Sequence, residues 1–143
     1  MQLPAELDTY VEAYFAAGNE LMGDGQLARA IETWTHALHL LPEPRFTWDA
    51  YTWLCASIGD AHYALSNLER ARDCFRDALN GPDGTRISCV QYRLGQCQFK
   101  LGALDAAVVS LLKVYVLGGE DLFRAEEDGL TYLHILKDRH FVR

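Results

Sequence analysis

The pair Leu94-Gly95, followed by Ala107 and then Leu111, is the third copy of a pattern that organises the whole chain. Two earlier copies have the same residue classes at the same offsets: Ile58-Gly59 with Ala71 and Phe75, and Ala17-Gly18 with Ala30 and Trp34. In each copy the alanine lies twelve residues after the glycine, and the large apolar side chain lies four residues after the alanine. This spacing indicates two short helices folded back on each other, with the small residues where the helices approach closely. The chain is therefore predicted to be a helical repeat.

Apolar residues recur at three- and four-residue spacing between these landmarks, which predicts amphipathic helices. Turn residues such as Gly23-Asp24-Gly25 and Gly81-Pro82-Asp83-Gly84 separate the helices. The predicted repeats occupy about 11–44, 52–85 and 88–119. A further helix over about 120–139, apolar on one side and acidic on the other, is expected to cap the repeats. We expect a single domain over residues 1–143.

The first two repeats are separated by an insertion. Gly59 follows Gly18 by 41 residues, while Gly95 follows Gly59 by 36. The excess lies over residues 45–51 and contains the aromatic residues Phe46, Trp48 and Tyr51. Exposed aromatic side chains are costly unless something covers them. Two interpretations stay open: either the chain itself covers them, or they form a surface for a partner.

The composition of the chain argues against some classes of function. The chain has 143 residues, 13 Lys and Arg together and a net charge of −7, so the basic footprint of a nucleic-acid binder is missing. Neither an export signal nor a membrane-spanning apolar run is recognised, and the four cysteines form no Cys-x-x-Cys pair. We therefore expect a cytoplasmic protein that binds neither nucleic acid nor membrane. Both ends of the chain are acidic, which favours solubility or the attraction of a basic partner.

The three in-phase repeats resemble the tetratricopeptide repeat (TPR) family over about three quarters of the chain. The resemblance implies an all-α, TPR-like right-handed superhelix of three helical hairpins plus a C-terminal capping helix. It also implies a scaffold that binds other proteins. One departure is that the family's aromatic position three residues after the glycine holds Leu21, His62 and Gln98 here. The first helices could be slightly rotated as a result.

The resemblance further implies a concave groove lined by one face of the first helix in each hairpin. On this sequence the groove positions are Glu12, Phe15, Asn19, Met22, Trp53, Ala56, Asp60, Tyr63, Cys89, Tyr92, Gln96, Phe99 and Lys100. TPR domains that grip an acidic chaperone tail use several Lys, Arg and Asn side chains, and only Asn19 remains of that set. Apolar anchors among amides and carboxylates favour instead a peptide with apolar side chains or a basic protein surface.

Two clusters could suggest chemistry. Glu32, His36 and His39 lie at helical spacing and could ligate a metal, but the pattern is not specific and solvated surface side chains explain it better. Asp60 and His62 with Cys55 or Cys74 could suggest a nucleophile and its base, although no oxyanion donor or glycine-rich loop accompanies them. We expect no enzymatic activity, no metal and no cofactor.

The sequence thus predicts a non-enzymatic protein–protein interaction module. The leading hypothesis is an escort or neutraliser of one protein partner, either an immunity protein against a toxin or a secretion chaperone. The alternative is an assembly or adaptor scaffold that binds peptides or associates with itself. The partner, the oligomeric state and the binding face are left open.

Overall fold

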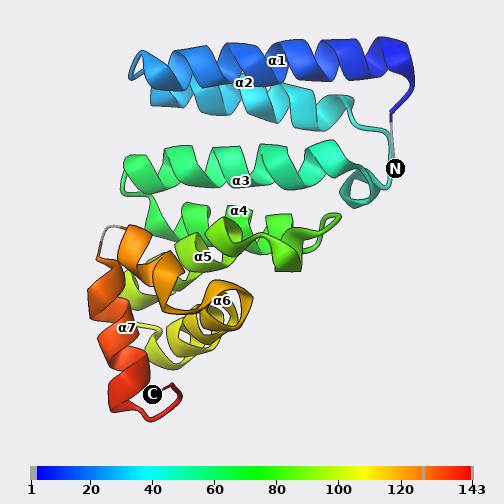
Figure 1. Cartoon of the computed structure of the whole chain (residues 1–143). Coiled ribbons are helices and arrows are strands. Elements are labelled where there is room, and N and C mark those ends of the chain that lie inside the picture. Colours follow the sequence, from blue (N-terminus) through cyan, green and yellow to red (C-terminus); the bar gives the residue numbers. More distant parts are fainter. Residues whose placement is uncertain (1–2, 127, 143) are drawn as a thin grey trace. The chain divides into compact units, whose positions relative to one another are not determined.

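A computed structural model describes residues 3–126 and 128–142. Within these residues all regular structure is helical, with seven α-helices and two short 3-10 helices (Figure 1). In chain order they are α1 (Ala5–Gly23), α2 (Leu27–Leu40), η1 (Arg45–Thr47), α3 (Asp49–Ala64), α4 (Leu68–Leu79), η2 (Gly84–Arg86), α5 (Ser88–Lys100), α6 (Leu104–Ala125) and α7 (Gly129–Asp138). The all-α prediction is confirmed. The chain forms two compact units, the first ending at Gly84 and the second beginning at Thr85, and the single domain stays a prediction.

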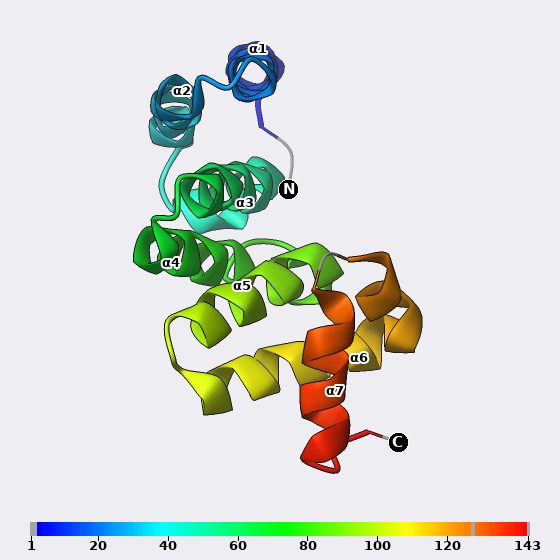
Figure 2. The ribbon, with the colours of Figure 1, turned by 90° about the vertical axis from the view of Figure 1, so that its left-hand side faces the viewer.

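In the first unit, α1 pairs with α2 and α3 pairs with α4, as the view along these helices in Figure 2 shows. Gly18 lies directly against the indole of Trp34, where a larger residue would clash, and Trp34 Nε1 donates a hydrogen bond to the Phe15 carbonyl at 3.1 Å. In the next pair, a Cβ on Gly59 would come within 2.9 Å of Phe75. The glycines of the repeat therefore mark the helix crossings, as the spacing predicts.

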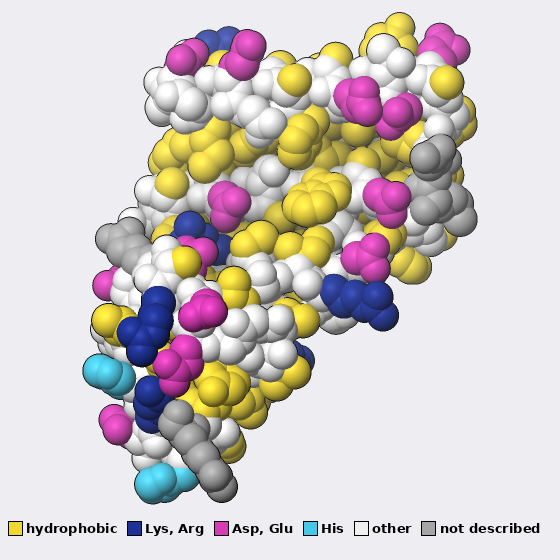
Figure 3. Space-filling view, viewed as in Figure 1, with side chains coloured by type: hydrophobic (Ala, Val, Ile, Leu, Met, Phe, Trp, Pro, Cys, Tyr) yellow, Lys and Arg dark blue, Asp and Glu magenta, His cyan; other side chains and the backbone are white. Residues whose placement is uncertain are grey.

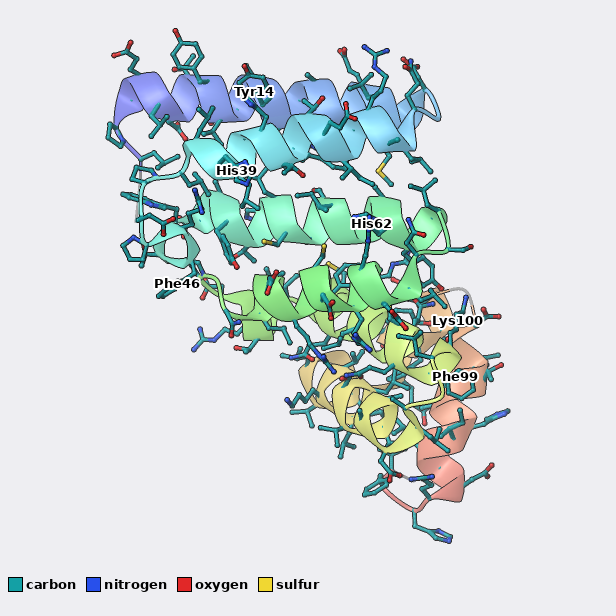
Figure 4. All side chains as sticks on the ribbon, turned by 180° about the vertical axis from the view of Figure 1, so that it is seen from behind. Tyr14, His39, Phe46, His62, Phe99 and Lys100 are labelled. Atoms are coloured by element: carbon teal, nitrogen blue, oxygen red, sulfur yellow. The ribbon has the colours of Figure 1, made fainter. Side chains whose placement is uncertain are left out.

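The insertion between the first two hairpins is partly a 3-10 turn and partly the start of α3, which begins at Asp49. Trp48 donates its indole N–H to the Pro42 carbonyl at 2.8 Å. Trp48 and Tyr51 both pack against the core of the first unit. Phe46 is 53% exposed and lies near the start of α3 (Figure 4). The chain itself thus partly covers Trp48 and Tyr51 and leaves Phe46 exposed, and the insertion surface stays a prediction.

In the second unit, α7 crosses α5 and α6 and completes the core (Figure 2). The buried residues of this core come from all three helices: Tyr92, Val108, Leu111, Val114, Phe123, Tyr132, Leu133 and Leu136. Tyr132 of α7 packs edge-to-face on Tyr92 and Phe99 of α5, with ring centroids 5.8 and 5.4 Å apart. The C-terminal helix is therefore an integral part of the core.

The prediction of one helix over 120–139 is wrong. The segment that begins at Glu120 continues α6 only to Ala125, and α7 starts at Gly129. Gly119 interrupts α6 with φ 65° and ψ −157°, a conformation that is essentially restricted to glycine. Asp128 has a left-handed backbone, with φ 61°. These two departures from helical geometry redirect the chain, so that α7 reaches the aromatic face of α5.

Candidate partner-binding surface

A cleft of about 440 Å³ lies between α1 and α3 of the first unit. Asp8, Val11, Glu12 and Phe15 of α1 line one side, and Ala50, Trp53 and Leu54 of α3 line the other. Residues three, four and seven apart share one face of a helix, so each wall is a single helix face. Figure 3 shows hydrophobic side chains gathered between these two helices, with carboxylates along α1. We call this site the α1/α3 cleft.

The α1/α3 cleft combines a buried apolar floor with an accessible aromatic wall. Val11 is 3% exposed and Leu54 is fully buried, whereas Trp53 remains 51% exposed. Phe15 is half-buried and its ring contacts Trp34. A half-exposed tryptophan on a rigid helix offers a large contact area at little cost in conformational entropy. The cleft can therefore take up an apolar side chain from outside.

The helices that form the cleft carry only negative charge. Their charged side chains are Glu6, Asp8, Glu12, Glu20, Asp49 and Asp60, and neither helix contains Lys or Arg. Asp8 and Glu12 line the cleft itself. Carboxylates beside a low-dielectric apolar surface attract cations and repel anions. An acidic ligand is therefore disfavoured here.

Three of the predicted groove residues, Glu12, Phe15 and Trp53, line this cleft, while Asp8, Val11, Ala50 and Leu54 were missed. Asp8 and Ala50 lie one turn before predicted residues, and Val11 and Leu54 lie next to predicted ones. The repeat was predicted to start near residue 11, whereas α1 begins at Ala5. Periodicity extended backward by one turn would have found Asp8.

The other predicted groove residues of the first unit lie outside the lining of the α1/α3 cleft. Asn19 is exposed, and Met22 packs partly against the core. Asp60 and Tyr63 are half-buried on α3, and Ala56 is 8% exposed. Their role at a partner surface stays a prediction.

In the second unit, the prediction that Tyr92 and Gln96 face an open groove is wrong, because both are only 2% exposed. The Tyr92 ring packs on Phe123 and Tyr132, which the redirected chain brings over α5. Arg93 donates a hydrogen bond to Gln96 Oε1 at 2.7 Å. In this unit Phe123 of α6 and Tyr132 of α7 pack on the face of α5 that the resemblance assigns to a partner.

The rest of the predicted groove in this unit keeps some access. Phe99 and Lys100 lie at the C-terminal end of α5 (Figure 4), and Phe99 is half-buried while Lys100 is exposed. Cys89, near the other end of α5, is also exposed. On this face of α5, the predicted groove residues are therefore accessible only at the two ends of the helix.

The buried titratable residues lie away from the α1/α3 cleft lining. Burial, with a further contribution from the Asp77 carboxylate, raises the pKa of Cys55 to about 12, so this thiol is protonated and a poor nucleophile at neutral pH. Burial and nearby Arg70 lower the pKa of His62, whose side chain points from α3 toward α4 (Figure 4). His36 instead packs edge-on against the ring of Tyr14, with centroids 4.8 Å apart. Among the described residues, no three His, Cys, Asp or Glu side chains are placed to hold a metal.

No helix in the described part of the chain is both long and apolar enough to cross a membrane. No protein-family model matches the sequence, and neither does any curated protein. Solved structures do match. The second TPR of Spaghetti (RPAP3), bound to the HSP90 peptide SRMEEVD, is 24% identical with a TM-score of 0.64, over 76% of this chain and 92% of that one. MamA is 21% identical with a TM-score of 0.68, over 84% of this chain and 65% of that one.

The protein has a TPR-like fold. The fold expected from the three Gly-Ala-large repeats is thereby confirmed. In TPR terms, the α1/α3 cleft lies between the first helices of two successive hairpins, α1/α2 and α3/α4.

Proposed function

We propose that this TPR protein is a non-enzymatic binding module whose α1/α3 cleft takes an apolar, positively charged segment of a protein partner. One observation carries the proposal. The half-exposed Trp53 shares a cleft with Asp8 and Glu12, on two helices that contain no Lys or Arg. The indole and Phe15 offer the apolar contact, and the carboxylates offer the preference for charge.

The expected energies give these residues different roles. A buried tryptophan at the centre of an interface commonly contributes about 2 kcal/mol or more to binding. An ion pair at an exposed rim contributes less than about 1 kcal/mol and mainly accelerates association. Lys or Arg could also stack on the indole face. Trp53 is thus assigned most of the affinity, and Asp8 and Glu12 the selectivity for charge.

The ligand that we expect for the α1/α3 cleft differs in charge from the peptide bound by the RPAP3 repeat. SRMEEVD contains three acidic residues and one arginine. In the α1/α3 cleft such a peptide would meet the carboxylates of Asp8 and Glu12 and no Lys or Arg from the two helices. We therefore expect this chain to discriminate against acidic tails.

The biological role that best suits this surface is the escort or neutralisation of one basic protein. An immunity protein against a toxin and a secretion chaperone both act by covering an apolar, charged surface of a single partner. Either role requires a tight 1:1 complex with a steep dependence on salt. An adaptor scaffold would instead bind short peptides weakly or associate with itself.

The test is a calorimetric titration with two amphipathic peptides that share the same leucines and phenylalanine and differ only in Lys against Glu. The Lys peptide is expected to bind, and the Glu peptide and SRMEEVD are not. Trp53→Ala should weaken binding at least about tenfold. The double change Asp8→Asn, Glu12→Gln should reduce both the affinity and its dependence on salt.

Phe46→Ala is the matched control, because Phe46 is as exposed as Trp53, 53% against 51%, but lies outside the cleft lining. The proposal fails if both peptides bind alike, or if Phe46→Ala and Trp53→Ala have the same effect. To separate a neutraliser from an adaptor, a partner captured through Trp53 would be measured for stoichiometry by light scattering. A 1:1 complex supports the escort or neutraliser.

A further inference from the structure

The outer face of α6 differs from the equivalent faces of α2 and α4. The repeat sets the register, because Ala30, Ala71 and Ala107 occupy the same position. Two, five, six, nine and ten residues after that alanine, the first two repeats carry mostly polar or charged residues. These are Glu32, Thr35, His36, His39 and Leu40 on α2, and Asp73, Arg76 and Asp77 on α4, followed by Asn80 and Gly81 beyond its end. The third repeat has Val109, Leu112, Lys113, Val116 and Leu117. The face that is mostly polar in the first two repeats is therefore mostly aliphatic in the third.

These aliphatic side chains are accessible. Val109 is 54% exposed, Val116 79% and Leu117 43%. With Leu112, Lys113, Thr85 and Gln91 they line a groove of about 540 Å³ within the second unit. We call it the α6 groove. Contiguous exposed aliphatic surface is typical of a site that something else covers.

The groove also contains an unsatisfied polar atom. Gln91 is 1% exposed, and its Oε1 has no hydrogen-bond partner in the described structure. A buried carbonyl oxygen without a donor is destabilising, so native proteins usually provide it with one. Since Gln91 lines the groove, a ligand that brings an N–H or O–H group there would satisfy it.

Among the residues that the structure describes, Lys113 is the only charged one that lines the groove. It lies four residues after Val109 and four before Leu117, at the middle of the aliphatic stripe. No ion pair joins it to another described residue. Two copies of this chain that paired antiparallel along the stripe would bring Lys113 against Lys113, which is unfavourable. The charge instead matches a carboxylate.

We propose that the α6 groove is a second docking site, for an aliphatic segment of another protein that places an Asp or Glu against Lys113 and a hydrogen-bond donor near Gln91. The stripe from residue 109 to 117 extends for about 12 Å, which fits two turns of a helix. The site does not depend on the α1/α3 cleft, whose charge is opposite. The two sites would then bind segments of opposite charge.

The test uses two helical peptides with an identical Leu and Val stripe and either Glu or Lys at the central position, measured by fluorescence polarisation. Wild-type protein is expected to bind the Glu peptide about three- to fivefold more tightly than the Lys peptide. Lys113→Glu should reverse that preference. Val116→Asp should weaken binding of the Glu peptide at least about tenfold, because a carboxylate replaces an apolar contact.

The matched control is His39→Asp, which introduces the same carboxylate at the equivalent exposed position of α2 and should leave peptide binding unchanged. Circular dichroism establishes that both variants fold. The proposal is overturned if Val116→Asp binds the Glu peptide like wild type, or if Trp53→Ala alone abolishes that binding. It is equally overturned if sedimentation shows a wild-type dimer that Val116→Asp dissociates, since the groove would then hold a second copy.

Discussion

The two units differ in whether the inner face of the first helix of each hairpin is accessible. Three residues before the repeat glycine stand Phe15, Ala56 and Tyr92, in α1, α3 and α5. In the first unit this face keeps a cleft with Trp53 half exposed. In the second unit Phe123 of α6 and Tyr132 of α7 cover it, and Tyr92 is only 2% exposed. The repeat motif therefore determines where helices cross, while the segment that follows determines whether a surface stays open.

The strongest test of this difference is Tyr132→Ala. Tyr132 is 2% exposed and contacts Tyr92 and Phe99, so truncation should cost about 3–5 kcal/mol of unfolding free energy. Hydrogen exchange should accelerate in α5 and α6 and stay nearly unchanged in α1 to α4. Leu130→Ala, on the same helix but 50% exposed, is the control. Equal loss of protection in both units would show that they do not unfold separately.

The repeat glycines give a second comparison between the units. Gly18→Ala should cost about 3 kcal/mol, because the new methyl group meets the hydrogen-bonded indole of Trp34. Gly95→Ala should cost less, about 1–2 kcal/mol, since the new methyl group would lie 2.8 and 2.9 Å from Leu111 Cδ2 and Cγ and so overlap them less than it overlaps the indole at Gly18. Urea denaturation of both variants measures the difference. Equal costs would mean that the indole can also move aside.

The two units should also differ in their response to acid. Burial lowers the pKa of His62 below its usual 6.5, so below that pH the unfolded state binds the proton more readily. The first unit should therefore lose stability as the pH falls from about 6.5 through the folded pKa, and His62→Gln should remove that part of the loss. Asp77, whose pKa is raised by burial, acts in the opposite sense, so the comparison of wild type with variant isolates His62.

The described histidines of the second unit, His134 and His140, are exposed. Segment-resolved hydrogen exchange at pH 7 and pH 5.5 separates the two units. A wild-type pH dependence that His62→Gln leaves unchanged would assign the effect to another group.

The smallest effect is expected at the ion pair of Arg139 and Asp105, whose atoms are 3.0 Å apart. Both side chains are accessible, at 38% and 95%, so Arg139→Gln should cost less than about 1 kcal/mol and less still in high salt. Thermal unfolding at two salt concentrations measures it. A larger loss would show that charge, as well as aromatic packing, holds the end of α7.

The helices and their pairing were predictable because the repeat spacing records local geometry. The glycines Gly18, Gly59 and Gly95 each face the large residue that the pattern assigns to them. The role of α7 was not predictable in the same way. Its position depends on Gly119 and Asp128, two backbone conformations that no periodicity encodes. The burial of Tyr92 depends on the same change in chain direction.

The same limit applies to the candidate site. Glu12, Phe15 and Trp53 were found from repeat positions, because they lie on faces that the repeat sets. Asp8 was missed because α1 begins before the repeat does. The α6 groove was missed because Val109 and Val116 look like an ordinary buried helix face until their exposure is known.

The packing of α7 on α5 determines when the second unit can fold during synthesis of the chain. Domains generally fold as units while the chain emerges from the ribosome. The first unit has its four α-helices once Gly84 has emerged. The second cannot bury Tyr92 until Phe123 and Tyr132 are also available, about 40 residues after α5 begins. During that interval we expect the aromatic face of α5 to stay uncovered.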